Sequence, residues 1–140
     1  MKFPVPMLYE LKVDQYQKVG KLLQSLDIHL AINSIIEGKS TGRIYVDDPN
    51  HPNSAFIWAR NRTFLVGKSQ NEVFNTAVKN LFEKEIYPES LKSGIDGFSL
   101  SYSPNSWGNT IKNVILNGKN PIEGQRQYFR FKDTRTRASL

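Results

Sequence analysis

The sequence contains no cysteine among its 140 residues. Without a thiol, the chain can form no disulfide, no thiolate zinc site and no cysteine nucleophile. Long apolar runs are also lacking, and no segment approaches the ~20 apolar residues of a membrane-spanning helix. The opening MKFPVPMLYEL is interrupted by Pro4 and Pro6, which does not fit a secretory signal. These absences predict a cytoplasmic protein that does not associate with a membrane.

The remaining composition is that of one globular domain, with 39% hydrophobic and 23% charged residues. The net charge of +6 permits binding to a polyanion but does not require it. Several of the cations lie near the C-terminus: Arg126, Arg130, Lys132, Arg135 and Arg137. We interpret these cations as part of a solvated strand face and of a basic, flexible tail over residues 133–140. Nucleic-acid binding is therefore not expected, and a small module that binds an anion or a nucleic acid is kept as an alternative.

Hydrophobic periodicity predicts an α/β (α+β) domain with a central mixed, mostly antiparallel sheet flanked by about four helices. Helices are expected at residues 15–26, 28–37 and 71–84, with a fourth running from Trp107 to Gly118. The third helix should bury a face formed by Val73, Phe74, Ala77, Val78, Leu81 and Phe82. The fourth should bury Trp107, Ile111, Val114 and Ile115. In the first helix, Asp14 and Gln17 have the spacing of a capping box, and Gly38 fits the C-cap of the second. Strands are expected at residues 43–47, 54–59, 63–66, 97–102 and 126–132, with a further one near 6–11. The last strand should place Tyr128 and Arg130 on one face and Phe129 and Phe131 on the other. The strands within residues 43–66 should form an antiparallel meander.

The loop between the first two meander strands contains Asp47, Asp48 and His51, which are residue types that bind metal ions. Asp and Asn are also common in turns, and the two prolines of this loop make it a rigid one. No fuller ligand set is visible nearby. We therefore expect a structural turn and no metal site.

The segment Gly67-Lys68-Ser69-Gln70-Asn71 leads from the last meander strand into the next helix. Such turns can hold phosphate groups, because the helix N-terminus offers unpaired backbone N–H groups. Ser69 and Glu72 have the spacing of a capping box, which predicts Ser69 as the N-cap.

The element order resembles that of the GNAT family of N-acetyltransferases. The strings HLAINSIIEGKSTGRIYVDDPNHPNSAFIW, NEVFN and NPIEGQRQYFRF are similar to the N-terminal half of GNAT-type proteins related to the zwittermicin A resistance acetyltransferase. The resemblance covers about residues 22–132 and implies a GNAT-like N-terminal domain over residues 1–132. In that group a second GNAT-like half carries acetyl-coenzyme A binding. The implied partner is therefore a C-terminal catalytic GNAT domain or a second copy of this chain.

The resemblance also implies a role for the turn at residues 67–71. In an active GNAT domain this turn reads Arg or Gln, two variable residues, Gly, one variable residue, then Gly or Ala, and its N–H groups hold the pyrophosphate. Here there is one glycine, Gly67, and Glu72 places a carboxylate in the first helical turn. The coenzyme A loop, at Gly67, Lys68, Ser69, Gln70 and Asn71, is thus predicted to be degenerate. A non-catalytic domain without its own cofactor is expected, and no catalytic residue is assigned. The alternative is a self-sufficient acetyl-CoA-dependent enzyme, with Lys68 supplying positive charge.

Overall fold

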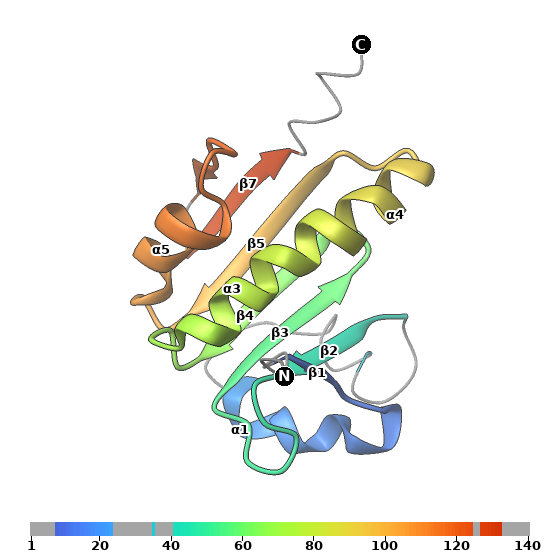
Figure 1. Ribbon diagram of the computed structural model, residues 1–140, viewed down its shortest axis with the longest axis vertical. Helices are drawn as coiled ribbons and strands as arrows, with labels where there is room; N and C mark the ends of the chain where they lie inside the picture. The colour runs from blue at the N-terminus through green and yellow to red at the C-terminus, as the bar shows by residue number, and fades with distance from the viewer. Residues whose placement is uncertain (1–7, 24–34, 36–40, 125–126, 133–140) are drawn as a thin grey trace, which may run out of the picture.

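The computed structural model describes residues 8–23, 35, 41–124 and 127–132. Its centre is a seven-stranded sheet in the order β1-β2-β3-β4-β5-β7-β6 (Figure 1). The strands are β1 (Tyr9–Glu10), β2 (Arg43–Val46), β3 (Ser54–Ala59), β4 (Arg62–Gly67), β5 (Gly97–Ser103), β6 (Ile122–Glu123) and β7 (Tyr128–Lys132). Among these strands β4 and β5 pair in parallel, and the other neighbours are antiparallel. The mixed, mostly antiparallel sheet predicted from the sequence is confirmed.

Two helical segments follow the parallel strands, and a third precedes the meander. The N-terminal segment consists of η1 (Val13–Val19) and α1 (Gly20–Leu23). A continuous helix after β4 comprises α3 (Glu72–Leu81), η2 (Phe82–Ile86) and α4 (Tyr87–Lys92), and a shorter one after β5 comprises α5 (Trp107–Thr110) and η3 (Ile111–Ile115). Figure 1 shows α3 and α5 on the same side of the sheet.

The meander of β2, β3 and β4 has the predicted antiparallel pairing. Ile44 faces Ile57, and Ile57 faces Phe64 in the next strand. The second turn consists of Arg60 and Asn61, with Arg60 at φ 61°, so β4 begins one residue earlier than expected. The sequence indicates these strands clearly because the meander is covered on both sides, so apolar and β-branched residues occupy both of its faces.

The helix after β4 is longer than predicted. It was expected to end near Lys84, before Pro88, but it continues to Lys92 through a π-helical stretch, η2. A proline inside a helix lacks one hydrogen-bond donor, and its ring clashes with a carbonyl of the preceding turn. The widened turn immediately before Pro88 accommodates both effects, so the helix is not broken there.

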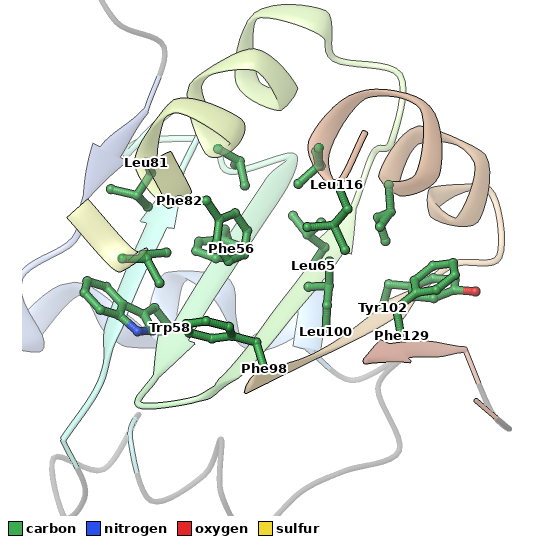
Figure 2. Packing of buried hydrophobic residues seen from close by; sticks show 14 of the residues in the cluster. Phe56, Trp58, Leu65, Leu81, Phe82, Phe98, Leu100, Tyr102, Leu116 and Phe129 are labelled. Carbon is green, nitrogen blue, oxygen red and sulfur yellow. The ribbon is translucent and has the colours of Figure 1, made fainter. Parts of the chain in front are cut away.

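The larger core lies between the sheet and the helices that follow β4 and β5. Phe82 is fully buried at its centre, with its ring 5.3 Å from that of Phe56 and 5.5 Å from that of Phe131 (Figure 2). The predicted inward positions Phe74, Val78, Leu81 and Phe82 are confirmed, as are Trp107, Ile111 and Ile115. The prediction that Val73 is buried was wrong, since this side chain is 55% exposed.

A second core covers the opposite face of the meander. There Tyr16 and Val19 of η1 pack with Ile35 against apolar residues of β2, β3 and β4. The N-terminal helix begins after Lys12, whose N–H donates to Gln15 Oε1, so the predicted capping box of Asp14 and Gln17 was wrong. The end of this helix, most of the predicted helix 28–37 and its Gly38 cap lie outside the described residues; Ile35 itself is helical and buried.

The two ends of the sheet agree with the predicted strands. Near the N-terminus, β1 lies within the predicted strand 6–11. At the other end Phe129 and Phe131 are buried while Arg130 is exposed, which is the predicted alternation. Arg126 and residues 133–140 lie outside the described part of the chain. No helix within that part is long and apolar enough to cross a membrane.

Candidate functional site

The turn at residues 67–71 lies at the carboxyl end of β4, where the chain enters α3. The carboxyl end of the parallel neighbour β5 lies beside it, because Val66 pairs with Ser103. Ligands of α/β sheets commonly bind in the crevice outside the carboxyl ends of parallel strands. The geometry of this turn therefore decides what the predicted coenzyme A loop can do.

Gly67 approaches the backbone of β3 very closely. Its φ is +90°, and a Cβ atom at this position would lie 2.1 Å from the carbonyl oxygen of Asn53. The next residue, Lys68, donates its N–H to that same carbonyl at 2.8 Å. The glycine is thus required for contact with a neighbouring strand. The space beside it that a ligand could use is already filled by the backbone of Asn53.

The turn is also bonded to the segment that follows β5. Trp107 donates its Nε1–H to the Gly67 carbonyl at 3.0 Å, and the Ser69 hydroxyl donates to Ser106 Oγ at 2.8 Å. The prediction of Ser69 as the N-cap was wrong, because its hydroxyl is committed to Ser106. Asn71 is the N-cap instead, with its Oδ1 accepting the N–H of Phe74 at 3.4 Å.

Asp47 holds Asn71 from the other side. Asn71 Nδ2 donates to Asp47 Oδ2 at 3.1 Å, and Asp47 Oδ1 accepts the N–H groups of Asn53 and Ser54 at 2.9 and 3.1 Å. The Ser54 hydroxyl in turn donates to the Lys68 carbonyl at 2.6 Å. Asp47 is therefore a structural carboxylate that joins the β2–β3 loop to the start of α3.

Asp48 also has a structural role, in the turn that follows. Its Oδ1 accepts the N–H groups of Asn50 and His51, and these two bonds lower the pKa of the carboxyl group. No group of three His, Asp or Glu side chains placed to hold a metal ion occurs within the described residues. The hydrogen bonds of Asp47 and Asp48 are those expected of turn residues.

Some donors of the turn remain available. The N–H groups of Ser69, Gln70 and Glu72 form no hydrogen bond within the part of the chain that the structure describes. The side chains of Gln70 and Glu72 are exposed, and so is that of Lys68. A phosphate group at these amides would lie near the positive charge of Lys68 and the negative charge of Glu72, and these two charges offset each other.

The comparisons with known proteins agree with this topology. The family model described as GNAT acetyltransferase matches residues 21–138, and the chain belongs to this family. A similar solved structure is that of an acetyltransferase of the GNAT family from Staphylococcus aureus Mu50. It is 12% identical with a TM-score of 0.54, over 89% of this chain and 97% of that one. This likeness shows the GNAT fold. No curated protein matches the chain.

Proposed function

We propose that this chain is a non-catalytic GNAT domain with a structural or substrate-side role in an acetyltransferase. The observation that carries the proposal is the hydrogen bonding of the turn after β4. Gly67 is packed against Asn53 and bonded to Trp107, and Ser69 is bonded to Ser106. Two donors that a pyrophosphate could otherwise use, the Lys68 N–H and the Ser69 hydroxyl, are therefore bonded to neighbouring protein groups.

The energy available from the remaining groups is small. An exposed charge pair such as one made by Lys68 contributes about 1 kcal/mol at most. A dissociation constant of about 10 micromolar requires roughly 7 kcal/mol of binding free energy. Glu72 opposes an anion at the same helix end, where the dipole would otherwise favour one. Useful binding of acetyl-coenzyme A by this turn alone is not expected.

The proposal includes a partner that supplies the catalytic half. In agreement with the resemblance to zwittermicin A resistance acetyltransferases, this would be a C-terminal GNAT domain or a second copy of the chain. Acetyl-coenzyme A would then bind to the partner. The described surface of this chain would provide support or contact the acceptor substrate.

Calorimetric titration of the chain with acetyl-coenzyme A tests the proposal. We expect no binding at about 10 micromolar, since the turn lacks the necessary free energy. Glu72→Gln removes the opposing carboxylate, and we expect it to produce at most a weak gain. A dissociation constant of about 10 micromolar or tighter for the unmodified chain would contradict the proposal.

The second candidate is a self-sufficient acetyltransferase with acetyl-coenzyme A as its cofactor. Two observations favour it. The N–H groups of Ser69, Gln70 and Glu72 bond to no described residue, and this chain covers 97% of the S. aureus acetyltransferase chain. In that case Lys68→Ala should weaken acetyl-coenzyme A binding. The matched variant Lys79→Ala, in the last turn of α3, should not.

A further inference from the structure

Two arginines lie on the face of β4, β5 and β7 that is opposite to the larger core. Arg62 pairs with Ser99, and Ser99 pairs with Arg130 on the other side. Paired residues in neighbouring strands point to the same face, and strands lie about 4.8 Å apart, so the two arginines flank Ser99 with their Cα atoms about 10 Å apart. Both arginines are exposed.

The two guanidinium groups extend in the same direction along the sheet. Arg62 lies over the ring of Phe64 at 5.6 Å, and Arg130 lies over the ring of Tyr128 at 5.9 Å. Phe64 and Tyr128 are themselves the register partners of Ser101. Each ring thus supports a planar cation beside β5, and Ser99 and Ser101 lie on the strand between the two strands that carry the arginines.

A cavity of about 560 Å³ adjoins this arrangement at the start of β5. Of the residues named above, Ser99 and Arg130 line it and Arg62 and Ser101 do not. The polar lining also includes Lys132, Asn61, Lys119 and Asn120, and the apolar lining includes Phe98 and Phe131. No carboxylate is among the described residues that line the cavity, although Lys119 is paired with Glu83 at 3.2 Å. Neither Arg62 nor Arg130 forms an ion pair with a described residue.

We propose that this face binds a phosphorylated small molecule. Its phosphate group would lie between Arg62 and Arg130, with Ser99 and Ser101 as hydroxyl donors. Arginine presents paired N–H donors that match the oxygens of a phosphate group, and a dianion suits two cations better than a single carboxylate does. The remainder of the molecule would occupy the cavity, whose volume lies within the usual range for small-molecule sites. The site is separate from the turn after β4 and does not depend on the function proposed for it.

The test is a nuclear magnetic resonance titration of the full chain with glycerol 3-phosphate, compared with inorganic phosphate and acetate. We expect amide shifts concentrated at Ser99, Ser101 and Arg130, with glycerol 3-phosphate bound most tightly and acetate most weakly. Arg62→Gln and Arg130→Gln should each weaken binding about tenfold, because each removes charge-assisted hydrogen bonds. Arg60→Gln, an exposed arginine in the adjacent turn, is the matched control and should leave binding unchanged. Thermal melting establishes that each variant is folded.

Three results would overturn the proposal. Arg60→Gln could weaken binding as much as Arg130→Gln, which would show diffuse attraction to net charge. The three anions could bind equally well, or shift amides away from β5 and β7. A short DNA duplex could bind more tightly than glycerol 3-phosphate at physiological salt, which would make this face a nucleic-acid surface.

Discussion

Asn71 donates a hydrogen bond from its side-chain amide to the carboxylate of Asp47 at 3.1 Å, across 24 residues of sequence. The contact joins the first turn of α3 to the loop between β2 and β3. Asn71 also accepts the Phe74 N–H, so one side chain both caps the helix and fixes its position. The start of α3 is therefore set by tertiary contacts with the meander, and this determines how the turn after β4 is held.

Replacing Asp47 should destabilise the protein. Asp47→Ala removes the acceptor of the Asn53 and Ser54 N–H groups and leaves the Asn71 amide with only its longer bond to Ser54 Oγ at 3.4 Å among the described residues. Unsatisfied buried donors are costly, so we expect a loss of about 3 kcal/mol in the free energy of unfolding, measured with urea. Asp48→Ala is the control and should cost less, since its two bonds lie in an exposed loop. Equal losses for the two variants would show that the Asp47 network adds nothing.

Two reasons for glycine at position 67, its close approach to Asn53 and its positive φ, can be tested separately. Gly67 and Gly94 both have positive φ, at 90° and 77°, but only a Cβ at Gly67 would collide with the backbone. Gly94→Ala should therefore cost only the strain of a left-handed residue, about 1–2 kcal/mol. Gly67→Ala should cost clearly more, because the strand β3 must also move. A comparison of urea midpoints checks this, and similar losses would contradict the assigned role of the contact.

Much of the fold follows from local patterns in the sequence. The aromatic and β-branched content of residues 54–59 and the helical spacing of Phe74, Val78 and Leu81 each match the structure. Such patterns report which side of an element is buried, and burial depends mainly on side-chain polarity. Val73 was misplaced because hydrophobicity alone does not establish burial; apolar residues are also common on the surface.

The contacts of the candidate site were not predictable in the same way. Ser69 and Glu72 matched a local capping pattern, yet the helix starts at Glu72 because Asn71 is held by Asp47. Trp107 was expected in the core, but its hydrogen bond to Gly67 depends on the parallel pairing of β4 and β5. Contacts between distant segments carry no periodic signal, so the sequence indicated the position of the turn without its partners.

The assignment of the α3 core face predicts a difference between two adjacent residues. Phe74 is fully buried, with its ring 6.5 Å from that of Trp107, whereas Val73 is exposed. Phe74→Ala should cost about 3–5 kcal/mol, since it leaves a cavity under the helix. Val73→Ala, the matched control, should change stability by at most about 0.5 kcal/mol. Chemical denaturation measures both, and a loss below about 1 kcal/mol for Phe74→Ala would refute the packing described here.

Buried tyrosines should make the protein sensitive to alkaline pH. Burial raises the pKa of Tyr45 to about 12 from the ordinary value of 10, and burial also raises the pKa values of Tyr16 and Tyr102. The unfolded chain thus releases these protons at lower pH than the folded protein does. The contribution of Tyr45 to the free energy of unfolding is therefore fully present below pH 10, and it is lost as the pH rises toward 12.

The effect of Tyr45 can be measured by urea unfolding at a series of alkaline pH values. Tyr45→Phe keeps the ring but removes the ionisable hydroxyl, so its stability should decline less steeply above pH 10 than that of the unmodified protein. Tyr9→Phe, in the edge strand β1, is the control and should retain the steep decline. Ultraviolet absorbance of tyrosinate follows ionisation in the same samples. If Tyr45→Phe and the unmodified protein lose stability in parallel, ionisation of Tyr45 is not coupled to unfolding.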